Sequence, residues 1–191
     1  MKLLVLLGSP REGGNSETLA RRIADGVTKE GGSVDYIRLN DLQLRPCQDC
    51  GGCVKTGVCV IMDDMTGIYA AVDAADRLLL VSPVYFYALS AQCKSCGDRF
   101  QARWSRKYLL KNRFRQGEGR KGYLLATSAT KGPKVFDCCK LSTRYIFDAM
   151  DLEYGGEFLV KGIDNREAVL ELPDEMTRAE QFGRDIGAGR I

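Results

Sequence analysis

The sequence contains no histidine and a single tryptophan among its 191 residues. Without histidine, a nucleophilic serine has no imidazole base, so a Ser-His-Asp triad is excluded. A metal site built on imidazole nitrogens is excluded for the same reason. The absence of histidine therefore favours chemistry that is carried by a bound cofactor.

The sequence also lacks a large excess of charge of either sign, and it lacks long apolar runs. The 28 basic residues nearly balance the 25 acidic ones, and the formal net charge is +3. This balance does not favour nucleic acid or an anionic membrane as a partner. The opening MKLLVLLGSP is too short in apolar residues for a signal-peptide core or a membrane span. We therefore expect a cytoplasmic protein with no nucleic-acid or membrane partner, and cytoplasmic cysteines are expected to stay reduced.

Short apolar runs alternate with amphipathic stretches, which is typical of a parallel sheet covered by helices on both faces. Strands are predicted at residues 2–9, 33–39, 77–83, 122–129 and 156–163. Apolar residues at helical spacing lie between them, as in Leu19, Ile23 and Val27. The predicted fold is α/β: a flavodoxin-like doubly wound five-stranded parallel sheet, with residues 1–191 as a single domain. In such a fold the ligand lies at the carboxyl ends of the strands.

The first of these carboxyl ends carries the segment GSPREGGNSETLARRI, which begins at Gly8. It offers a helix N-terminus, hydroxyl groups at Ser9 and Ser16, and the positive charge of Arg11, all of which favour an anion such as phosphate. The spacing matches neither G-x-G-x-x-G nor G-x-x-x-x-G-K-[ST], so neither a dinucleotide fingerprint nor a nucleotide triphosphate loop is indicated. The alternative is an ordinary strand-to-helix turn with Asn15 or Ser16 as the N-cap.

Four of the eight cysteines occupy one short segment, PCQDCGGCVKTGVC, within a loop expected at residues 45–62 after the second strand. Their spacing is C-x2-C-x2-C-x5-C, and the positions are Cys47, Cys50, Cys53 and Cys59. The C-x2-C-x2-C core is typical of loops that wrap a [4Fe-4S] cluster. Structural zinc usually takes two separated pairs of ligands, so zinc is the less favoured metal. Free or redox-active thiols are the third interpretation.

Three ordered segments resemble known flavoproteins. GSPREGGNSETL resembles the FMN phosphate loop of the NADPH-dependent FMN reductase group, and SPVYFYALSAQCKSCGDRF resembles its second flavin segment. The cysteine segment between them resembles that of the iron-sulfur flavoproteins. The match covers residues 2 to about 103, and LLATSA at 124–129 extends it. By this resemblance, the FMN phosphate is held by Ser9, Arg11, Asn15 and Ser16, the isoalloxazine is lined by Pro83, Val84, Tyr85 and Phe86, and the flavin edge is closed by Thr127 and Ser128.

The resemblance implies an FMN-dependent oxidoreductase, with a [4Fe-4S] cluster as the one-electron port to the flavin. Electrons would pass from ferredoxin or NAD(P)H to a small-molecule acceptor. The alternatives are a cluster-free NAD(P)H-dependent FMN or quinone reductase, a redox carrier without a substrate of its own, and a zinc-stabilised interaction module. The resemblance also implies a homodimer or homotetramer.

The remaining cysteines depart from the pattern of the group. Cys93 and Cys96 share one helical face, and Cys138 and Cys139 are adjacent in another predicted helix. The alternatives for these residues are a second metal site and a dithiol switch, but free cysteine commonly behaves as a small buried hydrophobe. We expect these four residues to belong to the core.

Two charged features are interpreted structurally. Between Arg99 and Lys121 the chain is strongly basic and carries the aromatic residues Trp104 and Tyr108. We expect this aromatic stripe to pack on the sheet or on a second subunit instead of binding nucleic acid. The pair Asp63 and Asp64 is expected to cap the helix that follows it.

Overall fold

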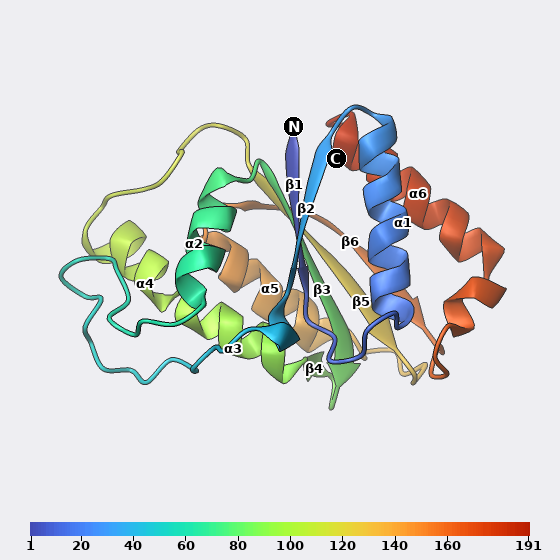
Figure 1. Cartoon of the computed structure of the whole chain (residues 1–191), viewed down its shortest axis with the longest axis horizontal. Helices are drawn as coiled ribbons and strands as arrows, with labels where there is room; N and C mark the ends of the chain where they lie inside the picture. The colour runs from blue at the N-terminus through green and yellow to red at the C-terminus, as the bar shows by residue number, and fades with distance from the viewer.

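The computed structural model describes residues 1–191, and its centre is a parallel sheet with the strand order β2-β1-β3-β5-β6 (Figure 1). The parallel strands are β1 (Lys2–Leu7), β2 (Ser33–Arg38), β3 (Arg77–Tyr85), β5 (Lys121–Ser128) and β6 (Glu153–Lys161). Among the parallel strands this order is the flavodoxin-like one, in which the chain runs outward from β1 in two directions. The predicted fold is confirmed, and all five predicted strands are present.

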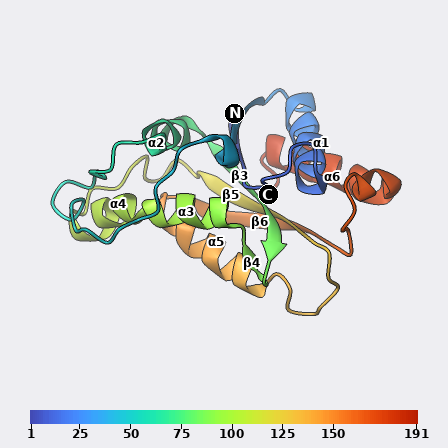
Figure 2. The same cartoon turned by 60° about the horizontal axis from the view of Figure 1, so that its bottom comes forward.

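Helices cover both faces of the sheet, as Figures 1 and 2 show. One face carries α1 (Asn15–Lys29) and α6 (Pro173–Gly187). The other carries α2 (Met65–Ala74), α3 (Ala91–Arg99), α4 (Gln101–Trp104) and α5 (Asp137–Ala149), with a π-helical turn at Ser105–Leu109 after α4. Short 3-10 turns lie at Leu39–Asp41 and Ala168–Glu171. No helix combines the length and the apolar character that a membrane crossing requires.

Two apolar clusters, one on each face, form the core. In β1, Leu3 and Val5 pack toward the face covered by α1 and α6, whereas Leu4 and Leu6 pack toward the face covered by α2, α3 and α5. All four are at most 1% exposed. A strand buried on both faces needs apolar side chains at consecutive positions, which explains the uninterrupted run KLLVLL.

A short antiparallel strand, β4 (Ala88–Leu89), pairs with the end of β3 and was not predicted. The two-residue turn that joins them consists of Phe86 and Tyr87, with φ angles of 49° and 63°. Hairpin turns with two positive φ angles strongly favour asparagine and glycine. The aromatic turn therefore gave no recognisable sequence signal, and it places the side chain of Phe86 fully in solvent.

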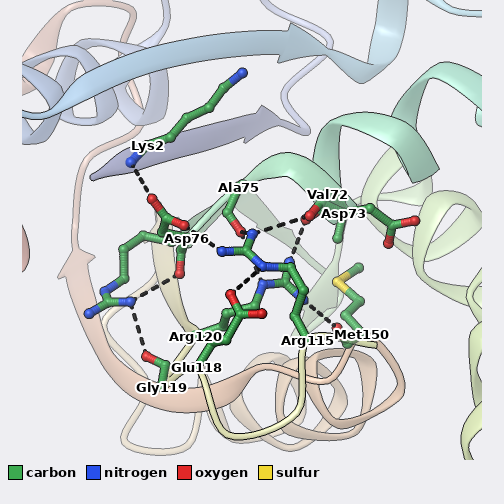
Figure 3. A network of polar contacts seen from close by, with 11 residues as sticks. Lys2, Val72, Asp73, Ala75, Asp76, Arg115, Glu118, Gly119, Arg120 and Met150 are labelled. Atoms are coloured by element: carbon green, nitrogen blue, oxygen red, sulfur yellow. Dashed lines mark hydrogen bonds and ion pairs between the residues drawn. The ribbon is translucent and has the colours of Figure 1, made fainter. Parts of the chain in front are cut away.

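The opposite, amino-terminal edge of the sheet is held by a network of arginines (Figure 3). The guanidinium of Arg120, 3% exposed, donates to the carbonyl oxygens of Val72, Ala75 and Met150. Arg115 also donates to Ala75 O, at 3.1 Å. These bonds supply donors at the carboxyl end of α2, where Val72 O also accepts from Ala75 N, and at Met150 O directly after α5.

Replacing Arg120 with methionine should destabilise the fold, because it removes from a buried position the donor to Met150 O and one of the two donors to each of Val72 O and Ala75 O. An unsatisfied buried polar group costs about 1–3 kcal/mol, and Met150 O is left without a donor, so we expect a loss of about 2 kcal/mol in the free energy of unfolding. Urea denaturation measures this value. Arg113→Ala is the control. The Arg113 side chain is exposed, so its ion pair with Asp151 should contribute less than about 1 kcal/mol. Equal stability of the two variants would contradict the role of Arg120.

Candidate functional site

A polar cavity of about 120 Å³ lies at the carboxyl edge of the sheet. Its walls come from the loop between β1 and α1, from the ends of β3 and β5, and from the loop after β6. The predicted site residues that line it are Ser9, Arg11, Asn15, Ser16, Pro83, Val84, Tyr85 and Thr127. Segments more than 100 positions apart in the chain therefore meet at the edge where this fold places its ligands.

The β1–α1 loop leaves the end of α1 open to an anion. Gly14 is the N-cap residue, and no side chain caps the helix. The alternative with Asn15 or Ser16 as the N-cap is therefore wrong. The first-turn N–H groups have no partner within a helix, and together with the helix dipole they favour a negatively charged group. Ser16, only 3% exposed, lines the cavity at this end.

Glu17 stabilises the loop from behind and was not identified from the sequence. Its carboxylate, 3% exposed, accepts from Gly13 N at 2.9 Å, from Arg21 Nη2 at 2.7 Å and from Arg38. Burial acts to raise the pKa of Glu17, but the bonds from Arg38, Gly13 and Arg21 hold it below its usual value. The charge of Glu17 is thus balanced, and its bond with Gly13 N holds the loop against α1.

Gly8 allows this loop to lie directly on α3. A Cβ atom at Gly8 would be 2.0 Å from Cys93 Sγ and 2.8 Å from the carbonyl oxygen of Val81. Any side chain here would force the loop or β3 to move. The buried Cys93 thiol therefore forms part of the floor beneath the first residues of the loop.

Two predicted flavin residues lie outside the cavity. Phe86 is at the tip of the β3–β4 hairpin with its side chain in solvent. Ser128 is buried, and its hydroxyl accepts from Thr130 N at 3.1 Å and contacts Thr130 O at 3.0 Å. Ser128 therefore shapes the turn after β5. The predicted flavin contacts of both residues remain predictions.

The loop after β6 contributes residues that carry no sequence motif. Asn15 Nδ2 donates to Asn165 O at 2.8 Å, and Asn15 Oδ1 accepts from Val169 N at 3.1 Å. Arg166 Nη2 donates to Glu12 O at 3.0 Å, and Arg166 lines the cavity. This loop therefore brings a second arginine beside Arg11. Only the tertiary contact with Asn15 reveals it.

The four cysteines of the predicted cluster line a second, smaller cavity of about 50 Å³, together with Arg99 and Ser105. Cys47 and Cys50 are exposed, and Cys53 and Cys59 are partly buried. Cys53 Sγ lies 3.7 Å from Ser105 Oγ. No group of three or more cysteine or acidic side chains is arranged to hold a metal ion. The thiols share one cavity, but they do not form a closed ligand set.

The cysteine loop has the backbone features expected for wrapping. Gly51 and Gly57 have φ angles of 70° and 68°, a region that glycine adopts without strain. Gly57 N donates to Cys53 O at 2.8 Å, which folds the second half of the segment into a tight turn. All potential ligands are thiols, and thiolates are the ligands that iron-sulfur clusters take. By its donor chemistry, the loop fits a cluster.

The cysteine loop starts at the carboxyl edge but extends away from the polar cavity. Figure 1 shows it passing along α3 to the neighbourhood of α4, whereas the β1–α1 loop lies at the start of α1. The bond from Arg99 Nη1 to Arg45 O, 2.7 Å, fixes the loop near the far end of α3. The two cavities share no lining residue.

The other cysteines belong mainly to the core. Cys93, Cys96 and Cys139 are at most 1% exposed, whereas Cys138 is exposed. The expectation of burial is thus wrong for Cys138. Burial raises the pKa of the Cys93 thiol to about 11 and that of Cys139 to about 12. The buried thiols are therefore poor nucleophiles at neutral pH.

In the metal-free native protein, iodoacetamide at pH 8 should modify Cys47, Cys50 and Cys138 at least about tenfold faster than Cys93, because the thiolate is the reactive form and Cys93 is both buried and protonated. Peptide mass spectrometry at increasing times measures each rate. The urea-unfolded protein is the control, and its cysteines should react at similar rates. Rapid native modification of Cys93 would contradict its place beneath the β1–α1 loop.

The aromatic stripe of the basic segment is not buried on the sheet. Trp104 is 37% exposed and Tyr108 is 39% exposed, and their ring centroids are 5.5 Å apart. They line a groove of about 680 Å³ together with Leu141 and Tyr145 of α5. Packing of this stripe on the sheet is thus wrong. Packing on a second subunit remains a prediction.

Comparison with known proteins places these observations in a family. Residues 1–135 match the family model described as NADPH-dependent FMN reductase, so the chain belongs to this family of flavin-dependent oxidoreductases. It is 40% identical to an iron-sulfur flavoprotein of Methanocaldococcus jannaschii over 99 residues, which cover 52% of this chain and 51% of that protein. The match therefore spans about half the length of this relative.

Two further similarities extend over more of the chain. The protein YwqN of Bacillus subtilis, whose name describes an NAD(P)H-dependent FMN-containing oxidoreductase, is 26% identical over 167 residues, covering 85% of this chain and 86% of YwqN. The structure of an NAD(P)H:quinone oxidoreductase from Methanothermobacter marburgensis superposes with a TM-score of 0.71 at 16% identity, covering 97% of this chain and 96% of that one. At this identity the superposition shows the shared fold alone.

Proposed function

We propose that this protein is an FMN-dependent oxidoreductase that carries a [4Fe-4S] cluster in its cysteine loop. The observation that supports FMN best is the polar cavity, where an open helix end, two hydroxyl groups and two arginines meet beside the end of β3. Backbone amides at a helix N-terminus and arginine side chains are the usual ligands of a phosphate monoester.

Each part of the cavity has a separate task in this proposal. Ser9, Arg11, Asn15 and Ser16 hold the phosphate, and Arg166 from the loop after β6 adds a second positive charge. Pro83, Val84 and Tyr85 present an apolar wall and backbone amides to the flat ring system. Thr127 and Ser128 close the edge of the flavin, and Phe86 lines the isoalloxazine ring. Bound FMN would accept a hydride or two electrons and could release them singly to a one-electron carrier.

The four-cysteine loop supports a cluster by its donor set and its shared cavity. Cys47, Cys50, Cys53 and Cys59 would be the ligands after the loop contracts around the metal. Because the cysteine loop lies away from the polar cavity within one chain, direct electron passage between the two favours contact across subunits. A homodimer or homotetramer would provide this contact, and either ferredoxin or NAD(P)H would supply electrons for a small acceptor in the cytoplasm.

A cluster-free NAD(P)H-dependent FMN or quinone reductase is the second candidate. It is favoured by the absence of a closed ligand set among the thiols and by the similarity to YwqN over most of the chain. If this chain is such a cluster-free reductase, its cysteine loop holds free thiols. A redox carrier without a substrate of its own would bind FMN but would not turn over.

An absorption spectrum of the anaerobically purified protein, with iron and sulfide assays, separates these candidates. The proposal expects flavin bands together with about four iron and four sulfide per chain, as a [4Fe-4S] cluster requires. FMN without iron, even after reconstitution with iron and sulfide, would leave the cluster-free reductase. Steady-state turnover with NAD(P)H or reduced ferredoxin then separates an enzyme from a carrier. A colourless protein that does not bind added FMN would overturn the flavin assignment.

A further inference from the structure

Arg99, the last residue of α3, is the most deeply buried charged side chain next to the cysteine loop. Its side chain is fully buried, and it forms a two-point ion pair with Asp63, whose side chain is 7% exposed. The bonds are 2.6 Å from Nη1 to Oδ2 and 3.1 Å from Nη2 to Oδ1. A buried pair of this kind is costly to form, so its partners and its position require an explanation.

The Arg99–Asp63 pair joins the two ends of the cysteine segment. On the entry side, Arg99 Nη1 donates to Arg45 O at 2.7 Å, and Asp63 Oδ2 accepts from Arg45 N at 3.0 Å. On the exit side, Arg99 Nη2 donates to Ile61 O at 3.1 Å. Residues 46–60, which include all four cysteines, thus lie between two points held by one guanidinium and one carboxylate.

One donor of Arg99 remains unused. Its Nε is buried and has no hydrogen-bond partner, whereas Nη1 and Nη2 together make four hydrogen bonds. Arg99 also lines the cavity of the four cysteines. Cys59 lines the same cavity, so at least one ligand sulfur shares this space with the guanidinium. A buried donor without a partner calls for an acceptor.

We propose that Arg99 is the positioning residue of the cysteine loop: it fixes the loop ends before any metal binds, and its spare Nε–H and positive charge stabilise the cysteine sulfurs of the shared cavity when a cluster is present. The first role concerns the chain alone. The second rests on the proposed function. Hydrogen bonds to ligand sulfurs and positive charge nearby raise the reduction potential of an iron-sulfur cluster, because they favour the more negative reduced form.

The first role is tested by hydrogen exchange of the metal-free protein. Arg99→Met removes the charge and all five donors at similar length, and we expect amide exchange in residues 46–62 to accelerate at least about tenfold, the factor that corresponds to losing about 1.4 kcal/mol of local stability. Lys107→Met is the matched control, because Lys107 is also a largely buried cation, in the π-helical turn after α4, yet it pairs with Asp148 of α5. Exchange in the loop at the wild-type rate in Arg99→Met would overturn the first role.

The second role is tested by anaerobic reconstitution, iron assay and a redox titration followed by electron paramagnetic resonance. Arg99→Met should retain less iron, and the remaining cluster should be harder to reduce by about tenfold in equilibrium constant, which is about 59 mV for one electron. Arg99→Lys restores the charge without the fork of donors, so its potential should lie between those of Arg99→Met and the wild type. The Lys107→Met control should match the wild type.

The outcomes separate the inference from the function on which it partly rests. A wild-type protein with a cluster, combined with an unchanged potential and iron content in Arg99→Met, overturns the second role alone. A wild-type protein that cannot take up iron overturns the cluster and the second role together, while the exchange experiment still decides the first. FMN content and circular dichroism of each variant show whether the fold is intact.

Discussion

Ser16→Phe should yield a folded protein that does not bind FMN. Ser16 lies at the open end of α1, is 3% exposed and lines the polar cavity, so a phenyl ring at this position would occupy the volume assigned to the phosphate. Titration of the metal-free, flavin-free protein with FMN, followed by flavin fluorescence, measures the dissociation constant. We expect an increase of at least about a thousandfold, or about 4 kcal/mol of binding free energy.

Graded variants show whether the phosphate is the cause. Ser16→Ala removes only the hydroxyl and should weaken FMN by about tenfold, the value of one charge-assisted hydrogen bond. Arg11→Ala should have a similar or larger effect, whereas Arg178→Ala, a surface arginine on α6, should have none. Riboflavin, which lacks the phosphate, should bind Arg11→Ala and the wild type equally. Tight FMN binding by Ser16→Phe would place the flavin elsewhere.

Cys50→Ser should remove the cluster and leave FMN in place. Cys50 lies on the exposed side of the cysteine loop and lines the shared cavity with the other three thiols. A serine hydroxyl is a far poorer ligand for iron than a thiolate. Iron and sulfide should fall from about four per chain to less than about one, while the flavin bands stay unchanged because the two cavities share no residue.

The exposed Cys138, outside the loop, provides the matched control for this substitution. Cys138→Ser should keep the wild-type iron, sulfide and flavin content. With ferredoxin as the donor, Cys50→Ser should lose electron entry before it loses any direct reaction with NAD(P)H. If Cys50→Ser and the wild type contain the same amount of iron after reconstitution, Cys50 is not a ligand.

The sheet could be predicted because burial on both faces forces apolar side chains at consecutive positions. Runs such as KLLVLL in β1 identify a central parallel strand without any tertiary information. The β3–β4 hairpin could not be predicted in this way. Its turn consists of Phe86 and Tyr87, both with positive φ, and nothing in the local sequence favours that conformation.

In the candidate sites too, some residues could be predicted from the sequence and others could not. Loop composition and order along the chain indicated Ser9, Arg11 and the cysteines, since these are residues whose chemistry is specific. The supporting contacts depend on side chains that meet only after folding. Glu17 looks like any acidic residue in a first helical turn, and Arg166 lies in a loop without a motif. Asp63 was expected to cap a helix, and it does accept from Met65 N at 3.1 Å, but its pairing with Arg99 across the chain was not foreseeable.

The joined ends of the cysteine segment have a consequence for how such a protein can change. Arg45 N donates to Asp63 Oδ2 at 3.0 Å, so the residues between them form a loop whose two ends are adjacent. An insertion or deletion inside this loop would leave the distance between its two ends unaltered. Changes of sequence within these roughly fifteen residues therefore need not disturb the sheet or the polar cavity. In evolution, a metal site in this loop could be gained, lost or altered independently of the rest of the fold.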